Sequence, residues 1–111
     1  MIKVKIYRQD KNNYITAFEI SGHAGSGPYG HDLVCAAVTA VSFGAVNAVI
    51  KLCDIDPFIE QSDDGGYLYV SLPYDLKQDI MVKANLLFEG MLISLQTIER
   101  DYQSFIDINE K

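Results

Sequence analysis

The sequence has no tryptophan and only two cysteines, two histidines and three prolines in 111 residues. Two cysteines are too few for a disulfide scaffold, which excludes the small secreted folds that depend on several bridges. Basic residues are also scarce: nine Lys and Arg stand against fifteen Asp and Glu, and the formal net charge is −6. Such a surface lacks the basic patch that neutralises phosphates, so we expect no direct binding of nucleic acid.

No leader segment or strongly apolar run is evident either. The first ten residues, MIKVKIYRQD, alternate apolar and polar positions and lack the apolar centre of a signal peptide, which predicts a cytoplasmic location. Residues 33–50 carry no charge and reach the length of a marginal membrane span. They are rich in small residues that drive insertion weakly, so we expect a buried core helix and no membrane association.

The length and the hydrophobic share of 49% predict a single packed domain over residues 1–111. Alternating apolar residues predict a β-hairpin from residues 2–7 and 14–21, the latter with Tyr14, Thr16, Phe18 and Ile20 on one face. Two more strands are expected at 54–61 and 66–72, joined by the turn SDDGG. Pro57 marks the first of these as an edge strand or a bulge.

Two helices complete the pattern. The first is expected to begin after Asp32, a favoured N-cap, to continue to about Cys53 and to be covered on more than one side. The second is indicated by apolar spacings of three and four that run from Ile80 to Phe105, and Asp75 with Gln78 resembles a capping box at its start. Surplus apolar residues widen this stripe and favour a homodimer interface: Leu86, Phe88, Leu92 and Ile93.

The expected fold is therefore α+β, a two-layer sandwich in which a four-stranded sheet carries two helices on one face. The elements follow one another in the order ββαββα. The two ββα halves are alike in pattern only, and no linker divides the chain.

The stretch GHAGSGPYGHDLVCAAV, residues 22–38, holds both histidines and one cysteine. Cys35 falls in the first turn of the first helix, where the helix dipole and free N–H groups favour a thiolate. His23 leaves the second strand, and the glycine-rich connection allows it to fold back over the helix start. There an imidazole can take the thiol proton and later donate a proton to a leaving amine, while first-turn N–H groups stabilise an oxyanion. These parts suit acyl transfer.

Residue types alone leave several roles open. A cysteine on an apolar helix is more often a core residue than a nucleophile. His31 is an alternative base or only shields the helix start, and Asp32 either orients a histidine or only caps the helix. Thr39, one turn after Cys35, either places its hydroxyl near the thiol or packs the helix. Cys53, about 27 Å farther along the helix axis at 1.5 Å per residue, is too distant to pair with Cys35 and is interpreted as structural.

Three other functions compete with catalysis. Four potential metal ligands lie within 13 residues, but their spacing matches no paired-ligand zinc pattern, so we expect no metal and no cofactor: His23, His31, Asp32 and Cys35. A thiol redox sensor is disfavoured because no resolving cysteine lies near Cys35. A non-catalytic binding module, in which Cys35 is a core residue, remains the alternative to an enzyme.

Four motifs together, SGHAGSGPYGHDLVCAAV, FGAVNAV, DDGGYLYV and LISLQTIERDY, resemble the ribosomal-processing cysteine proteases of the Prp family of Firmicutes. The resemblance extends over the whole chain. It implies a Cys–His endopeptidase whose catalytic pair is Cys35 and His23, which favours His23 over His31 as the base. The implied substrate is the N-terminal extension of large-subunit ribosomal protein twenty-seven, cut after a pair of aromatic residues during ribosome maturation.

The resemblance carries further expectations about assembly and the site. It implies a homodimer, and a mobile loop that closes over the site, formed by Gly25, Ser26, Gly27, Pro28, Tyr29 and Gly30. Family members often have Ser where this chain has Thr39, so the hydroxyl is kept. Aromatic residues at the cleavage site need an apolar pocket, for which the candidates are Tyr29, Phe43, Tyr67 and Tyr69.

Overall fold

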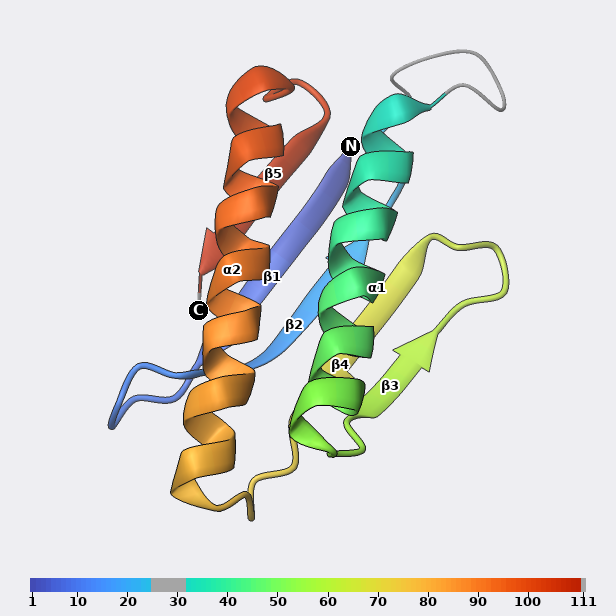
Figure 1. Cartoon of the computed structure of the whole chain (residues 1–111). Coiled ribbons are helices and arrows are strands. Elements are labelled where there is room, and N and C mark those ends of the chain that lie inside the picture. Colours follow the sequence, from blue (N-terminus) through green and yellow to red (C-terminus); the bar gives the residue numbers. More distant parts are fainter. Residues whose placement is uncertain (25–31, 111) are drawn as a thin grey trace.

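The structure, a computed structural model, describes residues 1–24 and 32–110. A single sheet forms one layer, and two helices that run in opposite directions cover one of its faces (Figure 1). The elements in chain order are β1 (Ile2–Arg8), β2 (Ile15–Ser21), α1 (Leu33–Cys53), β3 (Phe58–Gln61), β4 (Tyr67–Ser71), α2 (Gln78–Asp101) and β5 (Ile106–Glu110). The α+β class and the placement of both helices on one face agree with the sequence prediction.

The sheet has five strands in the order β3-β4-β2-β1-β5, so the predicted number of four was wrong. The strand that was missed, β5, pairs in parallel with β1, and the other neighbours are antiparallel. Its residues lie just beyond Phe105, which continues the helical apolar spacing. The helix instead ends at Asp101, and Ile106, 1% exposed, enters the core. Pairing between the two ends of a chain leaves no local signal in the sequence.

The β1–β2 hairpin forms as predicted, but a bulge changes which side chains face the core. Ile6 pairs with Phe18 and Tyr7 with Ala17, whereas Arg8 pairs with Ile15. Ile15 is therefore fully buried, in place of the expected Tyr14 and Thr16. The Asn85 side-chain amide on α2 donates to the Ile15 carbonyl at 3.0 Å, which satisfies the backbone beside the bulge.

Helix α1 lies on the sheet through one face. Its buried residues recur at spacings of three and four: Val34, Val38, Ser42, Val46, Val49 and Cys53. Leu33 and Leu52 are each 73% exposed, but α1 also packs against α2, so the helix is covered by the sheet and by a second helix as predicted. The helix is also long and apolar enough to cross a membrane, but core helices of soluble proteins meet the same criterion.

Helix α2 differs from the prediction at its start and on its apolar face. It begins at Gln78 with Lys77 as N-cap and no side-chain cap, so the expected capping box of Asp75 and Gln78 does not form. Phe88 and Leu92, expected to be surplus, belong to the core. The stripe is wide because α2 packs against both the sheet and α1. Phe88 meets the Phe18 ring edge-on, with centroids 5.3 Å apart.

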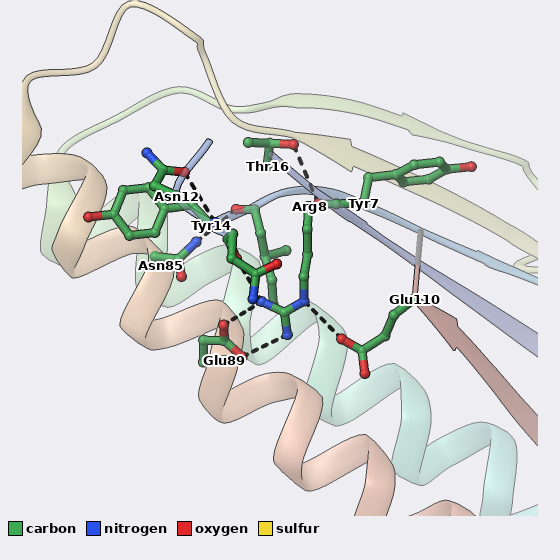
Figure 2. A network of polar contacts seen from close by, with 10 residues as sticks. Tyr7, Arg8, Asn12, Tyr14, Thr16, Asn85, Glu89 and Glu110 are labelled. Carbon is green, nitrogen blue, oxygen red and sulfur yellow. Dashed lines mark hydrogen bonds and ion pairs between the residues drawn. The ribbon is translucent and has the colours of Figure 1, made fainter. Parts of the chain in front are cut away.

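An ion-pair network ties β1, α2 and β5 together at the C-terminal end of β1 (Figure 2). The Arg8 guanidinium donates to both carboxylate oxygens of Glu89, at 2.7 and 3.1 Å, and through Nε to Glu110 at 2.8 Å. A bidentate arginine–carboxylate pair is strong and directional. It anchors the late strand β5 to the hairpin that begins the chain.

Candidate active site

The chain leaves β2 in a conformation that glycine alone adopts easily. Gly22 has φ +91°, and a side chain there would collide with the carbonyl oxygen of Met1. Its N–H donates to the Gly66 carbonyl at 2.9 Å. These two constraints fix the direction in which the next residue, His23, leaves the sheet.

Helix α1 begins as the sequence predicts. Asp32 is the N-cap, and its carboxylate accepts the N–H of Cys35 at 2.9 Å. The Ala36 N–H donates to the Asp32 carbonyl at 3.1 Å. The N–H groups of Cys35 and Ala36 are thus already engaged within the helix start, so the expectation that first-turn N–H groups hold an oxyanion is not supported for these two.

One hydrogen bond joins the strand end to the helix start. The backbone N–H of Ala24 donates to the Cys35 sulfur, Sγ, at 3.2 Å. Ala24 is buried, so this contact holds its neighbour His23 close to Cys35 across the interval of sequence that separates them. Two of the predicted site residues are therefore brought to one place. The Ala24 N–H itself was missed, because a backbone donor has no residue-type signal.

The electrostatics of the thiol differ from the sequence prediction. The pKa of Cys35 is raised, first by burial and then by the hydrogen bond and negative charge of Asp32. The Ala24 N–H and the N-terminal amine of Met1 act in the opposite direction but do not reverse the shift in pKa. The expected lowering at a helix start is wrong here because the cap is itself an anion. A raised pKa favours the protonated thiol, so attack by this sulfur requires a base that takes its proton.

His23 is exposed, and its imidazole lies against the turn between β3 and β4. Nε2 is 2.9 Å from the point where a Cβ on Gly66 would stand. Gly66 therefore leaves the space that the ring occupies, another feature that the residue pattern did not reveal. Thr39 lies one turn beyond Cys35 on α1 and is exposed.

The remaining candidates divide into those the structure describes and those it does not. His31 and the predicted closing loop, Gly25 to Gly30, lie outside the described residues. Phe43 is half-buried and packs on the core. Tyr67 and Tyr69 alternate with buried Leu68 and Val70, so they lie on the sheet face opposite the helices. The Tyr67 hydroxyl donates to Glu19 at 2.8 Å, and this hydrogen bond raises the pKa of Tyr67 to about 12.

Comparison with known proteins places this arrangement in a family. The family described as cysteine protease Prp matches residues 1–107. The chain belongs to the Prp family of cysteine proteases. A ribosomal processing cysteine protease Prp of Bacillus subtilis strain 168 is 50% identical over 103 residues, which cover 93% of this chain and 91% of that relative.

Solved structures of Prp proteins agree in fold. The crystal structure of the essential ribosomal processing protease Prp from Staphylococcus aureus, in complex with a covalently linked product peptide, has a TM-score of 0.90 and 42% identity over the full length of both chains. A second structure of that protease, in complex with a substrate peptide, has a TM-score of 0.83 and 40% identity, again over both full lengths. The predicted family is thereby confirmed.

Proposed function

We propose that this chain is an endopeptidase that removes the N-terminal extension of large-subunit ribosomal protein twenty-seven during ribosome maturation, with Cys35 as nucleophile and His23 as general base and acid. The observation that carries the proposal is the hydrogen bond from the Ala24 N–H to the Cys35 sulfur. It holds the residue next to His23 against the first turn of α1, where Cys35 is half-buried.

The raised pKa of the Cys35 thiol defines the first step. His23 takes the thiol proton as the sulfur attacks the peptide carbonyl, so base and nucleophile act together rather than from a preformed ion pair. The Ala24 N–H, pointed at the sulfur, favours the negative charge as it develops. The protonated imidazole then donates to the leaving amine, the peptide C–N bond breaks, and a thioester remains on Cys35.

Water completes the reaction. Neutral His23 removes a proton from a water molecule, whose oxygen attacks the thioester carbonyl. The carbon–sulfur bond breaks, the cleaved extension leaves as a carboxylic acid, and the proton returns to the sulfur. Asp32, Thr39 and His31 are supporting residues in this scheme, and the segment Gly25 to Gly30 is the loop that closes over the bound peptide.

The direct test uses the purified chain and a precursor of the ribosomal protein that carries its extension. We expect one cut after a pair of aromatic residues, seen by mass spectrometry as a single new N-terminus and one released peptide. An intact precursor after prolonged incubation with folded protein would overturn the proposal.

The protease is proposed to act as a homodimer in the cytoplasm, without a metal or cofactor and without direct contact to nucleic acid or membrane. The homodimer is supported by large apolar side chains left exposed on the helical layer, at Leu52 (73%), Leu86 (72%) and Ile93 (63%). Light scattering after gel filtration is expected to give twice the chain mass, and Leu86→Glu is expected to reduce it. A monomer at micromolar concentration would contradict this part.

A non-catalytic binding module is the second candidate, because the raised pKa of Cys35 is what a core cysteine would also show. Such a module would retain the ribosomal protein's extension without cutting it. Binding of the precursor with no cleavage by the wild-type chain would favour it.

A further inference from the structure

The turn between β3 and β4 lies against His23. Its Gly66 carbonyl accepts the Gly22 N–H at 2.9 Å, so the strand end and the turn are joined through the backbone. The His23 ring occupies the space that a side chain on Gly66 would fill, with Nε2 2.9 Å and Cε1 3.5 Å from the position a Cβ would take. The same turn therefore sets both the backbone before His23 and the surface on which its ring rests.

Asp64, two residues earlier in this turn, is held in a defined position. Its Oδ1 accepts the Ser62 hydroxyl at 2.6 Å and the Gly66 N–H at 2.9 Å. Oδ1 is 3.3 Å from the same Cβ position that lies 2.9 Å from His23 Nε2, so the two atoms are at most about 6 Å apart. Within residues 1–24 and 32–110, no donor to Asp64 Oδ2 is found. The hydrogen bonds of the turn thus fix the carboxylate through Oδ1.

The charge of the ring is felt at this carboxylate. The pKa of Asp64 is lowered, first by the Ser62 hydroxyl, then by the Gly66 N–H, and more weakly by the positive charge of His23. The carboxylate and the imidazole are thus close enough to interact electrostatically. Among the described residues, Asp32 and the Met1 amine act on the neighbouring Cys35, and Asp63 is the other carboxylate of the turn.

We infer that Asp64 is a positioning residue for His23, whose carboxylate orients the imidazole toward Cys35 and stabilises the ring while it carries the thiol proton. The inference rests on the proposed function of His23 as the base. It gives a role in catalysis to the turn SDDGG, which joins β3 and β4 and lies far in sequence from His23 and Cys35.

The test compares Asp64→Asn with Asp63→Asn. The amide oxygen introduced by Asp64→Asn can still accept from Ser62 and Gly66, so the turn keeps its shape while the charge is lost. Asp63 is the adjacent exposed carboxylate in the same turn and serves as the matched control. His23 ring protons are followed by NMR across the pH range, with His31→Gln used to assign the two histidines.

We expect the midpoint of the His23 titration to fall in Asp64→Asn, because the nearby negative charge is lost, and to stay at the wild-type value in Asp63→Asn. The acidic limb of kcat/KM for peptide cleavage, below which the His23 base is protonated, is expected to move the same way, with kcat reduced and KM retained. Asp64→Glu, which keeps the negative charge, is expected to return the His23 midpoint part of the way to the wild-type value. In about 1 M salt the Debye length is about 3 Å, so the difference in His23 midpoint between Asp64→Asn and the wild-type chain is expected to become smaller.

A second pair of variants tests the position of the ring rather than its charge. Gly66→Ala places a Cβ 2.9 Å from Nε2 and is expected to displace the ring and lower kcat several-fold. Gly44→Ala, with nothing within 4 Å of its Cβ, is the control. A His23 titration that is identical in Asp64→Asn and Asp63→Asn overturns the role of Asp64. Failure of the wild-type chain to cleave the precursor overturns the proposed function instead, so the two results are separable.

Discussion

Helix α1 carries one cysteine in its first turn and another in its last. Cys35 is half-buried, accepts an N–H from Ala24 and lies beside the carboxylate of Asp32. Cys53 is 5% exposed and belongs to the core cluster. The comparison teaches that neighbours and access, not residue type or helix membership, separate a candidate nucleophile from a core side chain.

The largest difference between the two cysteines is expected in cleavage of the ribosomal precursor. Cys35→Ala should abolish activity because the nucleophile is lost, whereas Cys53→Ala should retain it. Cleavage is measured as the appearance of the mature N-terminus by mass spectrometry. Both variants should give the wild-type circular dichroism spectrum, and retained cleavage by Cys35→Ala would remove this sulfur from the mechanism.

Alkylation tests the same contrast without a substrate. Iodoacetamide is expected to modify Cys35 roughly 100-fold faster than Cys53, because Cys35 is half-buried whereas Cys53 is buried in the core. Since the pKa of Cys35 is raised, its rate should keep increasing at pH values above the ordinary cysteine range. Peptide mapping after timed quenching gives both rates. Equal rates at the two sites would contradict the assignment.

Asp32→Asn is designed to bring the pKa of the Cys35 thiol closer to that of an ordinary cysteine. Loss of the carboxylate charge should lower the pKa of Cys35 and increase its alkylation rate near neutral pH several-fold. Asn is as good an N-cap as Asp, so the melting temperature should change little. An unchanged thiol titration would show that Asp32 does not act on the sulfur. A fall in cleavage despite faster alkylation would support a role for Asp32 in orienting a histidine.

At the other end of the helix, the expected effects are on stability. Cys53→Ala leaves a small cavity in the core and should cost about 1 kcal/mol in the free energy of unfolding. Cys35→Ala, at a half-buried position, should cost less. Urea denaturation followed by circular dichroism measures the free energy of unfolding of both variants. A larger loss of stability in Cys35→Ala than in Cys53→Ala would contradict the assignment of Cys53 as the core cysteine.

The smallest effect concerns the residue that ends α1. Asp54, the C-cap, has φ 53° and ψ 47°, a left-handed conformation that glycine adopts without the steric cost of a Cβ. Asp54→Gly should raise the free energy of unfolding by about 0.5 kcal/mol. Asp56→Gly, at an exposed position without positive φ, should lower it slightly. A destabilising Asp54→Gly would contradict this account of the helix end.

Much of the scaffold could be predicted because it depends on local pattern. Alternation located the first hairpin, Asp32 marked the start of α1, and Pro57 marked β3 as an edge strand. The prediction errors occur where contacts between residues far apart in the sequence determine the local structure. The bulge that buries Ile15 depends on pairing with Arg8, and Phe88 on α2 is core because Phe18 on the sheet meets it. The strand β5 forms because β1 offers an unpaired edge.

For the site, the sequence by itself determined the residue types, their order, and the helix cap that places Cys35 in a first turn. Only the tertiary structure decided the sign of the pKa shift of Cys35 and brought the Ala24 N–H to its sulfur. It also decided that the turn with Asp64 and Gly66 lies against His23. The physical reason is that periodicity and caps act within a few residues. Desolvation, charge–charge contact and the space left by a missing side chain depend instead on which distant segments the sheet brings together.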